Sequence, residues 1–328
     1  MSLTTTQYQQ IMHQYDLLRQ SHYRKEQARR AEVYEKIPEI QEIDQKIAHI
    51  SVERAKYRIR HQGKDQGTSL KEEIYDLSMQ KIDYLVRHGY PAYYLDPIYT
   101  CKDCQDTGYI GTKKCHCFID REKELFLEDS NLKEQLKEIN FNTFHLDYYS
   151  AEPCQDGRPS PRDNMRAILR ECQDFIQNFQ TKPGQNLLIN GSTGVGKTFL
   201  SICIAGKIID QGHSVIYMSS QELFERLADY TFRREKEEEV LTDDIINADL
   251  LIIDDLGTEM NNAFINSQLF QCVNDRMIRK KSVIINTNLS LEAITKRYTG
   301  RVTSRLIETY NPLNIYGEDI RMKKALMN

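Results

Sequence analysis

The chain has 328 residues and a mass of 38.5 kDa, a length that suggests two domains without excluding one large domain. Its 44 basic and 48 acidic side chains give a net charge of −4, which excludes a generally basic nucleic-acid coat. Any contact with DNA must therefore come from a local stripe of Lys and Arg side chains. The apolar runs are short, and none approaches the roughly 18 residues of a membrane-spanning helix.

The compartment is predicted from the amino terminus and the cysteines. The first ten residues, MSLTTTQYQQ, lack the charged and apolar regions of a secretory signal. Eight cysteines are too few for a disulfide scaffold in a chain of this length, and four of them crowd into residues 101–117. This clustering favours a metal site in a reducing compartment, so we expect a cytoplasmic protein with no membrane partner.

The amino-terminal part is predicted to be helical. Apolar side chains recur every three or four residues over 8–22, over 40–57 and over 70–88. Gly89 ends the last of these stretches, as glycine commonly does after a helix. A further single helix is expected from about residue 119 to residue 139.

The cysteine cluster predicts a structural Zn²⁺ site. A CxxC pair is followed ten residues later by Cys-His-Cys, so the candidate ligands are Cys101, Cys104, Cys115, His116 and Cys117. Zinc takes four thiolate or imidazole ligands in a tetrahedron, and we favour the four cysteines, with His116 as the alternative for one of the last two positions. Redox chemistry is the competing role of a CxxC pair. Such pairs normally open a helix in a thioredoxin-like βαβ unit, which the pattern does not show.

The second half of the sequence predicts an α/β domain. Residues 150–163 hold three prolines and a glycine, which is typical of a linker or surface loop. After them continuous apolar strands alternate with helices: helix 164–179, strand 186–190, helix 197–210, strand 214–219, helix 221–231, strand 250–254, helix 263–279 and strand 282–287. Apolar strands alternating with helices indicate a parallel sheet covered on both faces.

A phosphate-binding loop is predicted between the first strand of this domain and the helix after it. It consists of Gly191, Ser192, Thr193, Gly194, Val195, Gly196, Lys197 and Thr198, which match GxxxxGK[ST]. Its glycines let backbone N–H groups point at phosphate oxygens, and the helix directs its positive end at the same anion. Lys197 is expected at the β- and γ-phosphates of ATP, and the Thr198 hydroxyl at Mg²⁺.

Further polar residues follow two other strands. Asp254 and Asp255 come after the apolar run LLII, at the carboxyl end of a strand, where ligands bind in open α/β sheets. We expect Asp254 to hold Mg²⁺ and Asp255 to orient or activate the attacking water. Asn288 follows strand 282–287 and could reach the γ-phosphate, or could simply end the strand in a turn.

Two arginines lie one helical turn apart after Gly300. Arg301 and Arg305 share a face at this spacing. An arginine that completes the ATP site of a neighbouring subunit needs such a placement. The alternative is an ordinary solvated basic face.

These motifs together resemble the AAA+ ATPases of bacterial helicase loaders. The resemblance rests on the motifs GSTGVGKT, LLIIDDLGTE, INTN, and GRVTSRL followed by IYGEDIR. The resemblance is to the DnaI type, related to the DnaC loader and to the IstB transposition ATPase, and it covers about residues 141–328. It implies an AAA+ P-loop domain over 141–328 with no separate lid domain. A mostly helical zinc-binding domain over 1–140, which contacts a helicase, would precede it.

The resemblance also implies roles for single residues. Asn288 falls on the first sensor, and Arg321 looks like the second sensor. Arg305 is similar to the arginine finger, with Arg301 as the alternative. AAA+ proteins more often carry Glu where Asp255 stands, so weak ATP hydrolysis that a partner stimulates is expected.

The same resemblance implies single-stranded DNA on the inner face of a self-assembled ATPase. The candidate contacts are Phe232 with its neighbours Arg233 and Arg234, and Phe264. An aromatic ring beside arginines suits base stacking combined with phosphate neutralisation. Packing in the core is the alternative role for each Phe.

The sequence therefore carries two functional hypotheses. The first is an ATP-dependent loader of the replicative DnaB-family helicase onto single-stranded DNA, in initiation or restart of replication (primosome assembly). The second is an IstB-like transposition ATPase that assembles on DNA and recruits a transposase. The zinc-bearing first 140 residues favour the loader. A small-molecule kinase is a third class, which the Arg301 and Arg305 pair argues against.

Overall fold

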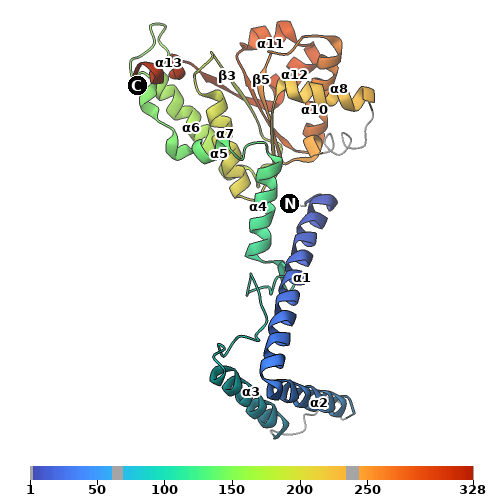
Figure 1. Ribbon diagram of the computed structural model, residues 1–328. Coiled ribbons are helices and arrows are strands. Elements are labelled where there is room, and N and C mark those ends of the chain that lie inside the picture. The colour runs from blue at the N-terminus through green and yellow to red at the C-terminus, as the bar shows by residue number, and fades with distance from the viewer. Residues whose placement is uncertain (1–2, 61–68, 234–243, 328) are drawn as a thin grey trace. The chain divides into compact units, whose positions relative to one another are not determined.

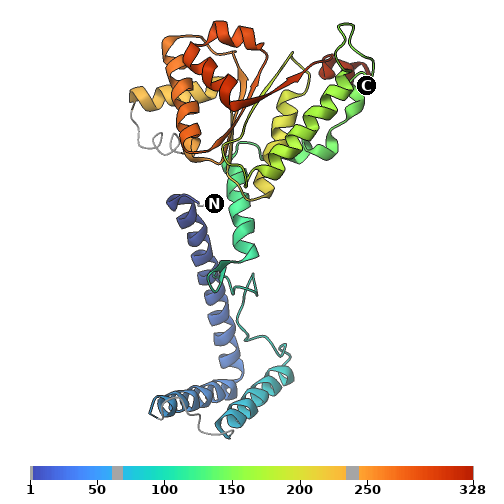
Figure 2. The ribbon, with the colours of Figure 1, turned by 180° about the vertical axis from the view of Figure 1, so that it is seen from behind.

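Figures 1 and 2 show the computed structural model of the protein, which describes residues 3–60, 69–233 and 244–327. By compactness the chain divides into two units, Ser2–Phe118 and Ile119–Asn328. The functional boundary expected between residues 140 and 141 stays a prediction. Within the described ranges, no helix combines the length and the apolar character needed to cross a membrane.

Three helices make up most of the first unit: α1 (Thr5–Lys36), α2 (Pro38–Arg60) and α3 (Ser69–Arg87). A capping box starts α1, because the Thr4 hydroxyl accepts from Gln7 N at 3.2 Å and the Gln7 side chain accepts from Thr4 N at 3.0 Å. Pro38 ends α1 and opens α2, since proline lacks an N–H and suits a first helical position. The predicted stretch 8–22 is thus part of a longer helix.

A small apolar core joins these helices. It consists of Val33, Ile37, Ile40 and Leu85, all buried, with tyrosines around them. Beside this core Lys36, Tyr90 and Tyr94 all donate to the Glu32 carboxylate. The ammonium of Lys36 and the two hydroxyls lower the pKa of Glu32 to about 2. The loop after α3 is thereby tied to α1.

The first unit ends in a short hairpin and the start of a helix. The hairpin strands are β1 (Tyr109–Ile110) and β2 (Lys113–Lys114), which pair antiparallel. The helix after them is α4 (His116–Asp129), followed by α5 (Gln135–Glu138) and the short 3₁₀ turns η1 (Phe141–Thr143) and η2 (Leu146–Tyr148).

The single helix predicted over 119–139 is wrong, because the chain breaks between α4 and α5. Asn131 has a left-handed backbone (φ 60°), which no continuing helix allows. The Ser130 hydroxyl accepts from Leu132 N at 3.2 Å and so holds the break. Asn tolerates this conformation better than most residues.

The second unit is built on a parallel sheet in the order β4-β5-β6-β3-β7. Its strands are β3 (Asn186–Gly191), β4 (Val215–Ser219), β5 (Leu250–Leu256), β6 (Ser282–Thr287) and β7 (Tyr310–Ile315). Its larger helices are α6 (Pro161–Asn178), α7 (Lys197–Asp210), α8 (Ser220–Arg233), α10 (Ala263–Ile278), α11 (Leu291–Arg297), α12 (Gly300–Thr309) and α13 (Ile320–Met327). Helices α6 and α7 cover one face, and α8, α10 and α12 the other (Figures 1 and 2). The predicted parallel sheet with helices on both faces is confirmed.

Two boundaries in this unit differ from the sequence prediction. The predicted linker 150–163 is shorter, because Pro161 opens α6 and the Ser160 hydroxyl caps it by accepting from Asp163 N at 3.1 Å. Strand β7 was not predicted. It contains Pro312, which an edge strand tolerates because one side of its backbone needs no ladder partner.

Candidate nucleotide site and metal centre

A cavity of about 350 Å³ lies at the carboxyl end of the sheet. Its polar lining is Thr143, Thr193, Gly194, Gly196, Lys197, Thr198, Asp255, Thr258, Asn288 and Arg321. Its aromatic and apolar lining is Ile139, Phe144, His145, Tyr148, Tyr149, Phe199 and Ile320. The structure therefore brings the predicted loop, Asp255, Asn288 and Arg321 to one cavity.

The glycines of the loop are required by their neighbours. Gly194 and Gly196 both have positive φ, at 78° and 100°. A Cβ on Gly194 would lie 2.1 Å from the Asp319 carboxylate, and one on Gly196 would lie 2.7 Å from the Tyr149 hydroxyl. Tyr149, which precedes α6, and Asp319, which directly precedes α13, therefore contact the loop from two sides. They leave no room for a side chain at Gly194 or Gly196.

Lys197 points into the polar end of the cavity. Its ammonium donates to the carbonyls of Gly191 (2.9 Å) and Ser192 (2.8 Å) and to Asn288 Oδ1 (2.5 Å). Burial lowers the pKa of Lys197, and the carboxylates of Asp255 and Asp254 partly oppose this shift. Because Lys197 and Asn288 are in contact, a phosphate that the lysine binds would also lie close to the Asn288 side-chain amide.

The carboxylate of Asp254 is almost completely buried, with 5% of the residue exposed. It accepts from the Thr198 hydroxyl at 3.0 Å, from Asn286 Nδ2 at 2.8 Å and from the Tyr217 hydroxyl. A hydroxyl and a carboxylate side by side are hard oxygen donors, which is the ligand type that Mg²⁺ prefers. Thr198 and Asp254 therefore fit a Mg²⁺ that also takes oxygens from phosphates.

Asp255 departs from regular strand geometry. The pairing of β5 with β6 shifts register between Ile253 and Leu256, and Asp255 has φ 54°. This irregularity exposes the side chain and directs it to the cavity. Although the residue is exposed as a whole, partial desolvation of its carboxylate, and then the charge of Asp254, raise the pKa of Asp255. A raised pKa makes a carboxylate a better proton acceptor, so its predicted role toward water is chemically reasonable.

The aromatic half of the cavity was missed by sequence reasoning. It comes from residues 139–149, which precede the predicted linker, together with Phe199 and Ile320. Tyr149 fixes this segment to the loop by donating to the Val195 carbonyl at 2.8 Å. Such a wall beside a phosphate-binding loop suits the flat ring of a nucleobase. The run FNTFHLDYY at 141–149 was the signal that could have found it.

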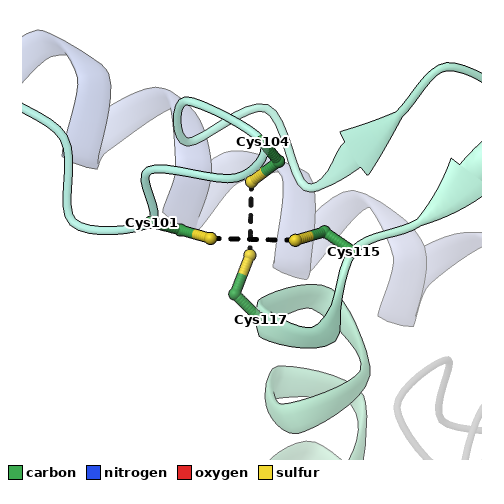
Figure 3. A group of neighbouring side chains, drawn as sticks. All are labelled: Cys101, Cys104, Cys115 and Cys117. Atoms are coloured by element: carbon green, nitrogen blue, oxygen red, sulfur yellow. Dashed lines mark hydrogen bonds between the residues drawn. The ribbon is translucent and has the colours of Figure 1, made fainter.

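The four predicted zinc ligands converge on one point, as Figure 3 shows. The Sγ atoms of Cys101 and Cys115 lie 3.7 Å apart, those of Cys104 and Cys117 lie 3.4 Å apart, and all four lie within 4.8 Å of one another. Tetrahedral Zn–S bonds of about 2.3 Å require sulfurs about 3.8 Å apart. The thiol geometry therefore fits Zn²⁺. His116 is mostly exposed, and its Nδ1 lies 3.5 Å from Cys115 Sγ.

Neighbouring groups orient these sulfurs. The Tyr15 hydroxyl lies 3.0 Å from Cys117 Sγ, and Gly108 N donates to Cys104 Sγ at 3.3 Å. Asp106 accepts from Cys101 N at 2.8 Å and lies 3.1 Å from His22 Nδ1. Helix α1 thus supplies two of the supports, which are typical of a structural metal site.

Comparison with known proteins identifies the second unit. Residues 167–327 match the family model described as "IstB-like ATP binding protein". The chain is 27% identical over 139 residues to the replicative helicase loader DnaC of Escherichia coli, which is 42% of this chain and 56% of DnaC. It is 25% identical over 173 residues to the replicative helicase loader DnaI of Bacillus subtilis (47% and 54%). It is 30% identical over 166 residues to the ATP-binding protein of insertion sequence IS21 from Pseudomonas aeruginosa (48% and 60%).

The chain carries a DnaC/DnaI/IstB-like AAA+ domain. The sheet, the phosphate loop and the acidic pair agree with this assignment. The chain spans between 54% and 60% of the length of the three relatives above, so the similarity identifies an ATP-binding domain and does not by itself carry over their whole activities.

Other predicted residues of the AAA+ domain lie away from its cavity. Arg305 on α12 is half-buried, donates to Glu308 Oε2 at 3.3 Å and does not line the cavity, and Arg301 is exposed. Phe264 on α10 is half-buried against the apolar core, so the packing role holds for part of its ring. The side chains of Phe232 and Arg233, and all of Arg234, lie outside the described residues.

Replacing Lys197 tests the nucleotide site. Lys197→Ala should weaken binding of a fluorescent ATP analogue roughly ten- to hundredfold, because a hydrogen bond to a charged group contributes about 1.5–3 kcal/mol. The matched control is Lys207→Ala, an exposed lysine on the same helix. Unchanged ATP binding in a folded Lys197→Ala protein would contradict the assignment.

Replacing one thiol tests the metal centre. Protein purified without chelator should contain about one zinc per chain, and Cys101→Ser should lose it together with part of the helical signal, since structural zinc supplies folding free energy. Elemental analysis and circular dichroism measure both effects. Cys154→Ser, in a loop remote from the cluster in sequence, is the control and should keep the metal. A metal-free wild-type chain would refute the site.

Proposed function

We propose that this protein is an ATP-dependent loader of a DnaB-family replicative helicase onto single-stranded DNA, acting in initiation or restart of replication. The observation that carries the proposal is the presence, in one chain, of an AAA+ nucleotide site and a helical unit with a four-cysteine cluster ahead of it. DnaC and DnaI, which share the AAA+ part, are both helicase loaders by name.

In this proposal ATP occupies the cavity with its base against the aromatic wall. Lys197 neutralises the β- and γ-phosphates, and Thr198 with Asp254 holds Mg²⁺. Bound Mg²⁺ would supply charge stabilisation for phosphoryl transfer. Asp255 accepts a proton from the attacking water, and Arg321 faces the phosphates from the start of α13. Hydrolysis by the isolated protein is expected to be weak.

Arg305 is proposed to act on a neighbouring subunit. It does not line its own chain's cavity, and Glu308, its ionic partner within the described part of the chain, is mostly exposed. A half-buried guanidinium at the surface of one subunit could reach the phosphates that a neighbouring subunit binds. Self-assembly through the ATP sites follows from this role.

Single-stranded DNA is the proposed second partner. Phe232, Arg233, Arg234 and Phe264 are the candidate contacts, and with a net charge of −4 only a local stripe of this kind could bind DNA. Binding should therefore weaken steeply with salt.

One observation favours the alternative, a transposition ATPase that recruits a transposase. The matching family model is IstB-like, and the IS21 relative is 30% identical over its matched stretch. The family model matches residues 167–327, so the unit with the four cysteines lies outside the matched region. The amino-terminal unit is therefore the part that discriminates between the two functions.

Helicase capture tests the proposal. The full chain should bind a purified DnaB-family ring helicase without ATP, because residues 1–140 are expected to make the contact. A chain reduced to residues 130–328, which begins after α4, should lose that binding and keep ATP binding. Size-exclusion chromatography and ATP titration measure the two properties. Helicase binding by 130–328 would refute the division, and transposase binding with no helicase binding would favour the alternative.

Mixing two variants tests the trans role of Arg305. Arg305→Ala should bind ATP within about twofold of wild type but lose hydrolysis, because the transition-state charge loses its cation. Adding Lys197→Ala protein should restore part of the activity, since each variant keeps the half-site that the other lacks. Arg301→Ala, one turn away, tests the alternative finger and should keep hydrolysis if Arg305 has the role. Failure of two assembled, folded variants to complement would assign Arg305 to its own chain.

A further inference from the structure

Tyr217 touches the predicted Mg²⁺ ligand from the edge of the sheet. It lies on β4, and its hydroxyl donates to Asp254 Oδ2. Burial and the charge of Asp254 raise the pKa of Tyr217, so the hydroxyl keeps its proton and is the donor. The carboxylate is held on its other sides by Thr198 and Asn286. Tyr217 therefore fixes one oxygen of Asp254 without lining the cavity itself.

The backbone of Tyr217 contacts the break between α4 and α5. Strand β4 ends the sheet, and on its outer side Tyr217 N donates to the Ser130 carbonyl at 3.2 Å. Asn131 Nδ2 donates to the Tyr217 carbonyl at 3.4 Å. Both backbone groups of Tyr217 are thus occupied by two adjacent residues.

The Ser130–Asn131 segment is itself well fixed. Ser130 is completely buried, and its hydroxyl donates to the Leu127 carbonyl at 2.7 Å. Asn131 holds the left-handed turn, after which Leu136 on α5 packs so close to Gly206 on α7 that a Cβ there would lie 2.8 Å away. The Ser130–Asn131 segment is thus held by its own hydrogen bonds, and it bonds both backbone groups of Tyr217.

We propose that Tyr217 is a positioning residue for the Mg²⁺ ligand Asp254, and that the Ser130–Asn131 contact sets its position. The inference rests on the proposed nucleotide function of the cavity. It adds a route of regulation, because Ser130 and Asn131 do not line the cavity and directly follow α4. A partner that shifts Ser130–Asn131 would change the affinity of the site for Mg²⁺–ATP.

Tyr217→Phe in the full-length chain tests the first part, because it removes only the hydroxyl. Affinity for a fluorescent ATP analogue in EDTA should stay within about twofold of wild type. The Mg²⁺ concentration that half-saturates the metal-dependent gain in affinity should rise about tenfold, as for other supports of metal ligands. Tyr316→Phe, whose hydroxyl donates to the Pro159 carbonyl, is the matched control and should match wild type.

Asn131→Gly tests the second part. Glycine accepts the left-handed backbone and removes the amide that holds Tyr217. This variant should also raise the Mg²⁺ requirement, and the double variant should show less than the sum of the two effects, because both act through one hydroxyl. Full additivity would overturn the coupling.

The outcomes also separate this inference from the proposed function. A Tyr217→Phe protein with wild-type Mg²⁺ dependence would overturn the positioning role. A wild-type chain that binds no nucleotide would overturn the proposed function instead. Equal loss of affinity in EDTA and in Mg²⁺ would indicate a merely structural role for Tyr217 and would also overturn the inference.

Discussion

The buried carboxylate of Asp254 is the group around which the second unit is arranged. An ionised carboxylate inside a sheet is costly unless donors surround it, and here they come from three neighbouring elements. Thr198 opens α7, Asn286 lies on β6 and Tyr217 on β4. The sheet order brings β5 between β4 and β6, so the parallel topology itself supplies two of the three side-chain donors. Fold and site chemistry therefore constrain each other at one residue.

The sequence predicted the parts of this site that depend on local pattern. The four strands with continuous apolar runs follow from residue order alone and are confirmed, and the loop 191–198 joins β3 to α7 as its pattern predicts. The missed parts depend on contacts between distant segments. The register shift at Asp255, the aromatic wall from 139–149 and the edge strand with Pro312 leave little local signature. Of the amino-terminal helices, the first was predicted much too short, because the polar surfaces of α1 obscure its periodicity, whereas the other two lie close to their predicted bounds.

The first unit is stabilised by different interactions from the second. Its apolar core is small, with four buried residues in the cluster between its helices. Polar contacts supplement it: Glu32 with its three donors, and Asp106 beside the cysteines. A metal held by the four cysteines would add to so small a core, since metal binding contributes directly to folding. The four thiols and the Tyr15 contact connect α1 to the segment that leads into α4.

The left-handed backbone at Asp255 limits how this site could evolve. Asp is one of the few residues that adopt this conformation readily, whereas Glu, the residue more common at this place in AAA+ proteins, gains no such local compensation. A Glu side chain at this position would extend further into the cavity, but it would favour the left-handed backbone less than Asp does. Asp255 therefore combines a proton-accepting group that faces the cavity with a residue type that suits the left-handed backbone in β5.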